Sequence, residues 1–169
     1  MRSASEKTEG HKTLILNSSA VIELVENNLL RSLALLRRKA NYNFIIPTPV
    51  WNELSQETRN ALLNYIDDTI KIEEVDPAKI RELSAAHPPL GRGELSVILL
   101  ALEKDATAIL DYKKARQAAN KIGLKLHGTL WLIIEMTRHC TLTPQKAEEI
   151  TLSLPQRGFH TTPNLLTKQ

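Results

Sequence analysis

Four oxygen-bearing side chains of this sequence stand where a binding site could form: they are Asn17, Glu53, Glu94 and Asp111. Asn17 and Asp111 each follow a short apolar run, and Glu53 and Glu94 stand near the starts of expected helices. Carboxylate and amide oxygens are ligands suited to Mg²⁺ or Mn²⁺. Acids that gather at one point also repel each other unless a cation lies among them. If the four side chains converge, the sequence therefore predicts a site for a divalent metal.

Each of the four side chains also has a purely structural interpretation. Asn17 and Asp111 could each cap the helix that follows, which is a common function of these residue types at a helix start. Glu94 could interact only with the dipole of its helix, and Glu53 could simply lie in solvent. Their shared position favours a site, because ligands of open parallel sheets bind beyond the carboxyl ends of the strands.

The elements that must position these residues alternate between strands and helices. Short apolar runs bounded by turn residues predict strands, and apolar residues three or four positions apart predict helices. The expected strands are residues 13–16, 44–46, 69–75, 107–110 and 124–126. The expected helices are residues 21–39, 50–55 and 58–67, a short helix that begins near 77, a helix that begins at 94, and residues 113–122, 129–138 and 143–154. This alternation predicts an α/β fold with a central parallel sheet and helices on both faces.

Two helices carry further expectations. Residues 87–93 form the clearest loop and lead to Glu94, where Gly91 and Gly93 are expected to let the backbone turn tightly before the helix. The buried stripe of this helix is expected at Leu95, Ile98, Leu99 and Leu102. In the first long helix, some apolar residues could form a patch for a partner if the sheet does not cover them: these are Leu29, Leu30, Leu33 and Leu36.

Length and composition predict a single soluble domain over residues 13–169, after a polar tail over residues 1–12. The formal net charge is +3, which permits a polyanionic partner without requiring one. Cys140 is the only cysteine, so an intrachain disulfide and a Cys-rich zinc site are both excluded. No apolar run is long enough to span a bilayer, so we expect no membrane partner. A reducing, cytoplasmic compartment is expected.

The ordered set of motifs resembles the PIN domains, and in particular the VapC-like toxin ribonucleases. The stretches that carry the resemblance are Leu16-Asn17-Ser18-Ser19, Pro47-Thr48-Pro49-Val50-Trp51-Asn52-Glu53, Gly93-Glu94, Ile109-Leu110-Asp111 and Gly123-Leu124. Residues 111–116, followed by Ala119, Gly123 and Gly128-Thr129, resemble one PIN subfamily closely. The resemblance implies a PIN-like three-layer sandwich.

The resemblance also implies metal-dependent cleavage of RNA, with acids that hold Mg²⁺ or Mn²⁺ so that the ion activates water at the scissile phosphate. Glu53, Glu94 and Asp111 match acidic positions of the family's site. Asn17 stands where the family has aspartate, and Tyr112 stands where the subfamily usually has a second aspartate. Two functions therefore stay open: a divergent endoribonuclease that is the toxin of a type II toxin-antitoxin pair, or a catalytically inactive PIN fold that binds protein or RNA.

Partners follow from the same resemblance: single-stranded or structured RNA, a cognate antitoxin protein and a second copy of the chain in a homodimer. The candidates for contact with RNA phosphates are Arg92, Lys113, Lys114 and Arg116, which flank the acids in the sequence. A solvated helix face explains the same cations equally well.

Overall fold

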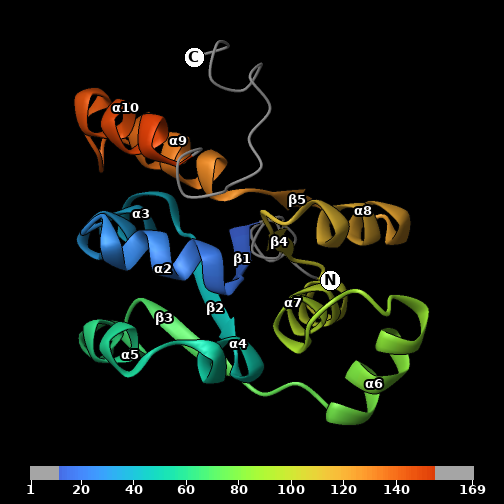
Figure 1. Cartoon of the computed structure of the whole chain (residues 1–169). Helices are drawn as coiled ribbons and strands as arrows, with labels where there is room; N and C mark the ends of the chain where they lie inside the picture. Colours follow the sequence, from blue (N-terminus) through green and yellow to red (C-terminus); the bar gives the residue numbers. More distant parts are fainter. Residues whose placement is uncertain (1–11, 155–169) are drawn as a thin grey trace, which may run out of the picture.

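A five-stranded sheet lies at the centre of the protein, whose structure is a computed structural model that describes residues 12–154 (Figure 1). The strands are β1 (Thr13–Leu16), β2 (Asn43–Pro47), β3 (Ile70–Glu73), β4 (Thr107–Ile109) and β5 (Leu126–His127). Their spatial order is β3-β2-β1-β4-β5, and every pairing is parallel. The predicted parallel sheet is confirmed, and β1 is its central strand. The expected tail up to residue 11 and the segment 155–169 lie outside the described residues.

Helices surround the sheet and connect its strands: they are α2 (Ser18–Glu26), α3 (Leu30–Ala40), α4 (Thr48–Glu53), α5 (Gln56–Leu62), α6 (Pro77–Ala86), α7 (Arg92–Lys104), α8 (Lys113–Ile122), α9 (Thr129–Arg138) and α10 (Pro144–Ser153), with a 3₁₀ turn η2 (Leu63–Tyr65). Helix α7 packs against β1, β2 and β4, and α6 and α8 pack against α7. Helices α2, α3, α9 and α10 lie on the opposite side of the sheet (Figure 1). The three-layer α/β fold is therefore confirmed. Within the described residues, no helix is long and apolar enough to cross a membrane.

The core lies between the sheet and these two layers. In β1, Leu14, Ile15 and Leu16 are almost completely buried, because a central strand is covered on both faces. The edge strand β3 instead alternates, with Ile70 buried and Lys71 exposed. Since all strands are parallel, their carboxyl ends meet at one edge of the sheet, and the residues that follow them lie there together.

The prediction of one helix over residues 21–39 is wrong. The chain breaks between α2 and α3, where Asn28 adopts the left-handed conformation at φ 56° and the Leu29 amide donates to the Leu24 carbonyl over 2.8 Å. Asparagine enters this conformation more readily than most residues, so the Asn27-Asn28 pair can end a helix despite the apolar spacing around it.

The break has a consequence for the proposed leucine patch. Leu29, Leu30, Leu33 and Leu36 are at most 7% exposed, because α3 turns its apolar face into the core. The expectation that they form a partner surface is therefore wrong. In α7, Leu95, Ile98 and Leu99 are buried as expected, but Leu102 is 54% exposed in the last turn of the helix, and Ala101 is buried instead.

Candidate active site

Asn17 stands at the centre of the carboxyl edge, directly after β1. Its backbone N–H donates to the Ile109 carbonyl over 3.3 Å, which continues the pairing of β1 with β4. The side chain is 5% exposed. Although Asn17 is the N-cap residue of α2 by position, its side chain makes no capping bond. Among the described residues, its Oδ1 is the single buried side-chain N or O atom without a hydrogen-bond partner.

This orphan oxygen argues against the capping interpretation of Asn17. A buried polar atom without a partner is destabilising by roughly 1–3 kcal/mol, and such atoms are uncommon in native proteins. A ligand that approaches the carboxyl edge would meet an acceptor that the protein itself leaves unused.

Asp111 follows β4 and is held by three hydrogen bonds. Its Oδ2 accepts from Ser19 Oγ over 2.9 Å and from Thr129 Oγ1 over 2.5 Å, and its Oδ1 accepts from the Thr129 backbone N–H over 2.8 Å. The expected local cap is wrong, because the N-cap residue of α8 is Tyr112 and its side chain makes no capping bond. Asp111 instead caps α9, whose own N-cap residue, Gly128, has no side chain to do so.

Gly128 makes room for this arrangement. A Cβ at Gly128 would lie 2.9 Å from Asp111 Oδ1 and 3.2 Å from Arg116 Nη1, so a larger residue would displace one of these groups. Arg116 Nη1 also donates to the Leu110 carbonyl over 2.9 Å. The guanidinium of this candidate RNA contact is therefore fixed at the end of β4.

Glu53 and Glu94 meet at the start of α7. Glu53 is the last residue of α4, and its Oε1 accepts from the Gly93 N–H over 3.1 Å. Glu94 Oε2 accepts from the Gly91 N–H over 3.2 Å, which satisfies a free donor of the first helical turn. Both carboxylates thus lie at the positive end of the α7 dipole.

Burial raises the pKa of Glu94 above its ordinary value, the bond from the Gly91 N–H acts in the opposite direction, and the negative charge of Glu53 raises it further. The two acids therefore repel each other in the protein without a metal.

The two glycines before Glu94 differ in what they do. Gly91 has an extended backbone, with φ −78°, and a Cβ there would meet nothing within 4 Å. The expectation that it is needed for a tight turn is wrong. A Cβ at Gly93 would lie 2.5 Å from Glu53 Oε1, so this glycine is required for the close approach of Glu53 to the helix start.

The four predicted residues form two groups at the carboxyl edge, with Asn17 on the strand between them. Glu53 and Glu94 lie on the β2 side, and Asp111 lies on the β4 side with Ser19 and Thr129. Within residues 12–154, no three Asp, Glu, His or Cys side chains are close enough together to hold one metal ion. A shared metal site stays a prediction. Sequence patterns did not point to Thr129 as a partner of Asp111, although Gly128-Thr129 at a helix start was a local signal.

Cations and a groove border these groups. Lys113 and Lys114 are exposed in the first turn of α8, and Arg92 is exposed at the start of α7. A groove of about 520 Å³ lies beside Glu53 and Arg92, between α4, the start of α6 and the start of α7. Sequence analysis did not identify this groove, because its walls come from segments separated along the chain.

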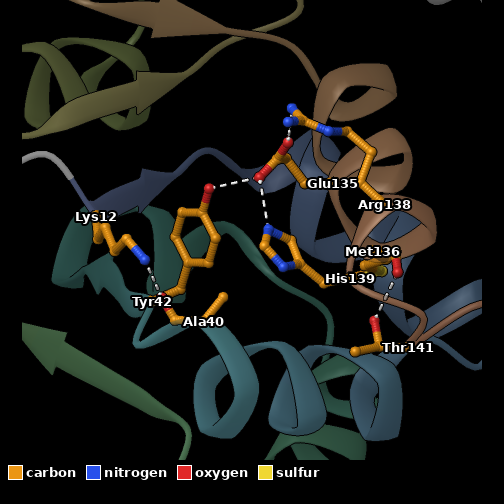
Figure 2. A network of polar contacts seen from close by, with 8 residues as sticks. All are labelled: Lys12, Ala40, Tyr42, Glu135, Met136, Arg138, His139 and Thr141. Carbon is orange, nitrogen blue, oxygen red and sulfur yellow. Dashed lines mark hydrogen bonds and ion pairs between the residues drawn. The ribbon is translucent and has the colours of Figure 1, made fainter.

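A second polar cluster lies where α9 packs beside the start of β2 (Figure 2). Glu135, which is 4% exposed, accepts from Tyr42 Oη over 2.6 Å and from Arg138 Nη1 over 2.7 Å, and His139 Nε2 lies 3.5 Å from its Oε2. Burial, followed by the hydrogen bond to Glu135, raises the pKa of Tyr42. Because Tyr42 precedes β2, this cluster is at the amino edge of the sheet, away from the candidate site.

The chain is similar to several known proteins. The family model described as PIN domain matches residues 13–169. One similar structure is that of VapBC2 from Rickettsia felis, which was solved bound to a DNA fragment from the VapBC2 promoter. One of its chains has 17% sequence identity to this chain and a TM-score of 0.52, and the match covers 69% of this chain and 98% of that one. A PilT N-terminus domain protein from the archaeon Sulfolobus solfataricus P2 has 18% identity and a TM-score of 0.46, with 73% and 92% covered. Among curated protein sequences, none shows significant similarity to this chain.

Proposed function

Because this chain belongs to the PIN domain family, we propose that it is a divergent endoribonuclease that uses Mg²⁺ or Mn²⁺ and is the toxin of a type II toxin-antitoxin pair. The observation that carries the proposal is the buried Oδ1 of Asn17, which has no hydrogen-bond partner within the described residues and stands at the carboxyl edge between Asp111 on one side and Glu53 and Glu94 on the other. This is the edge where open parallel sheets bind their ligands.

The donor set fits a hard divalent cation, because every candidate ligand offers oxygen. Because no three acids of the described residues lie close enough together to hold one ion, binding would have to draw Asp111 and Glu94 toward it, with Glu53 and the Asn17 carbonyl as further oxygen ligands. When bound, such an ion lowers the pKa of water and neutralises charge on a phosphoryl oxygen. Burial raises the pKa of Glu94 most, and repulsion by Glu53 adds to it; a cation near both acids would relieve that repulsion, which supports the same assignment.

The chain's own cations would bring RNA to this edge. Lys113, Lys114 and Arg92 are exposed beside the acids, where they can contact phosphates of a bound strand. Arg116 would contribute with the N–H groups that its bond to the Leu110 carbonyl leaves unused. RNA affinity is therefore expected to fall as salt concentration rises.

The runner-up function is a catalytically inactive PIN fold that binds protein or RNA. The observation in its favour is that Asp111 already accepts three protein hydrogen bonds, so an ion would have to share an acid that the fold uses as a cap. Asn17 and Tyr112, which are neutral where the family pattern has acids, favour weakened activity as well.

For a partner, we propose a cognate antitoxin, by analogy with VapBC2, one chain of which has a similar fold. A homodimer remains part of the proposal without a defined surface, because the leucines predicted to form one are buried in the core.

The decisive experiment compares wild type, Asn17→Asp, and Asn17→Asp combined with Glu94→Gln in calorimetric Mn²⁺ titrations and in cleavage of a labelled single-stranded RNA. One added negative charge in a partly dry cleft is expected to tighten Mn²⁺ binding by about tenfold and to speed cleavage. The double variant is expected to lose this gain if both residues share one ion.

Asn64→Asp is the matched control, because it adds the same charge at an exposed position in η2. It is expected to behave as wild type. If Asn17→Asp remains folded but leaves metal binding and cleavage at background, the enzyme proposal fails and the binding-module function stands.

A further inference from the structure

The groove beside the candidate site shares a wall with it, because Glu53 lines both. Its volume of about 520 Å³ falls within the range of sites that bind small molecules. Arg92, on the same groove, directly precedes Gly93, whose N–H binds Glu53. A strand of polymer that occupies the site therefore has its next unit within reach of this groove.

The groove combines an apolar surface with exposed polar groups. Val75 and Ile80 are buried, and Pro49 beside them is half-buried, so part of the wall is apolar and well packed. Asn52, Glu74 and Arg92 are exposed on its rim. These three side chains make no hydrogen bond or ion pair with any other residue that the structure describes, so their donors and acceptors are available to a ligand.

We infer that this groove is a subsite for one nucleobase of the RNA substrate and that it prefers a base with an exocyclic amino group. The inference rests on the proposed function, since it takes the polymer at the site to be RNA. An ionised Glu74 can only accept hydrogen bonds, so it matches the amino groups of adenine, cytosine and guanine. Uracil offers a single donor, its N3–H, which lies between two carbonyl oxygens that repel the carboxylate, so its bond to Glu74 is expected to be weaker.

The other two rim residues fit the same occupant. The Asn52 amide carries both donors and an acceptor, which allows it to pair with a base edge. Arg92 can hold the phosphate that joins this base to the nucleotide in the site. The apolar wall suits the face of a planar base, whose polar groups lie at its edges.

Charge distinguishes a base from two other occupants. A phosphate inside the groove would face both Glu53 and Glu74, which repel it. A basic side chain of a peptide would be attracted by these acids but would meet the Arg92 guanidinium. A base is uncharged and presents donors and acceptors together, so it can pair with Asn52 and Glu74 while Arg92 holds the adjoining phosphate at the rim.

The test measures binding of fluorescently labelled RNA hexamers of adenosine, cytidine or uridine by anisotropy, with EDTA present to prevent cleavage. Wild type is expected to bind the adenosine and cytidine hexamers about tenfold more tightly than the uridine hexamer. Glu74→Gln keeps the size of the side chain but adds donors, so the difference is expected to shrink to about twofold.

Two further variants give this test its controls. Arg92→Gln is expected to weaken binding of all three hexamers equally and to reduce the slope of log affinity against log salt by about one. Glu82→Gln changes an exposed acid of α6 that does not line the groove, so it is expected to keep the wild-type preference. Circular dichroism melts confirm that each variant is folded.

Three results would overturn the inference. If the hexamers bind equally well and Glu74→Gln changes nothing, the groove does not read a base, while the proposed function stands. If no hexamer binds, even with Mn²⁺ added, RNA as the substrate fails together with the groove. If a hexa-arginine peptide binds in a way that needs Glu74 and does not compete with RNA, the groove is a peptide site instead.

Discussion

Replacing Asn17 by aspartate is expected to destabilise the metal-free protein and to make its stability depend on Mn²⁺. The Asn17 side chain is 5% exposed, and its Oδ1 lacks a protein partner. A carboxylate there would lose its hydration without gaining a hydrogen bond. Asp111, held nearby through Ser19, would add repulsion. Both effects raise the pKa of the new carboxyl group in the folded protein, against the smaller opposing effect of the positive end of α2.

The expected size of the effect follows from these two causes. A rise of about two pKa units corresponds to about 3 kcal/mol of lost stability at neutral pH. For a chain of this length, the melting temperature would fall by about 6–12 °C. Because the pKa of this acid is higher in the folded than in the unfolded protein, the loss of stability is largest at pH values above the folded-state pKa. The loss disappears at pH values below the ordinary pKa of aspartate. Mn²⁺ at about 100 times its Kd would restore about 2.7 kcal/mol.

The assay is thermal unfolding of wild type, Asn17→Asp and the exposed control Asn64→Asp, each in EDTA and in Mn²⁺. Only Asn17→Asp is expected to melt early in EDTA and to recover with the metal. If Asn17→Asp melts together with wild type in EDTA, position 17 is not the buried, partnerless environment argued above. If Mn²⁺ raises the melting temperature of all three proteins equally, the ion binds elsewhere.

Two other perturbations test the surroundings of the site and the cluster at the amino edge. Because burial and the charge of Glu53 raise the pKa of Glu94, the metal-free protein is expected to lose stability as pH rises from the ordinary pKa of a glutamate through the raised one. Glu94→Gln should remove this pH dependence of the melting temperature and weaken Mn²⁺ binding in calorimetry. An unchanged pH dependence and an unchanged titration would contradict the assignment. Tyr42→Phe removes the 2.6 Å hydrogen bond to the buried Glu135 (Figure 2), so the free energy of unfolding, measured in urea, is expected to fall by about 1–3 kcal/mol. The control is Tyr65→Phe, because the Tyr65 hydroxyl makes no hydrogen bond to the other described residues. If Tyr42→Phe destabilises the protein no more than this control, the bond to Glu135 contributes nothing.

Much of the fold could be predicted from the sequence because local signals and packing agree in many elements. The strand at residues 13–16 and the helices at residues 113–122 and 129–138 have the predicted bounds. Each is a short apolar run or an amphipathic stretch with a turn residue at its boundary, such as Gly123 or Gly128. Parallel pairing then followed from the alternation of strands and helices.

The break between α2 and α3 could not be predicted from periodicity. The apolar residues on both sides of Asn27-Asn28 keep a helical spacing, so the pattern favoured one continuous helix. A single left-handed residue, Asn28, changes the chain direction without changing that pattern. The four leucines are buried because of how this segment packs in the fold, which periodicity does not give, so the prediction of a partner surface failed.

The site was predictable in its location and not in its hydrogen bonds. Strand ends place Asn17 and Asp111 at one edge, and this follows from the sheet alone. The partners of Asp111 are Thr129 and Ser19, which are 18 and 92 positions away along the chain. Capping rules describe only neighbours within a few residues, so they assigned Asp111 to the wrong helix.

The fold also explains how the carboxyl edge tolerates its acids and why Asn17 separates the two proposed functions. In a parallel sheet with helical crossovers, α2, α7 and α9 all begin at this edge, and their N-terminal N–H groups favour negative charge. Glu53 and Asp111 each bind such an N–H, from Gly93 and Thr129. At α2, the neutral Asn17 leaves the positive helix end without an acid. That weakens a site for a cation but reduces the repulsion of an RNA phosphate. Asn17 therefore opposes metal-dependent cleavage and favours RNA binding without a metal. If the protein is a binding module, Asn17→Asp would lower its RNA affinity in EDTA. If it is a nuclease, the same change would speed RNA cleavage in Mn²⁺.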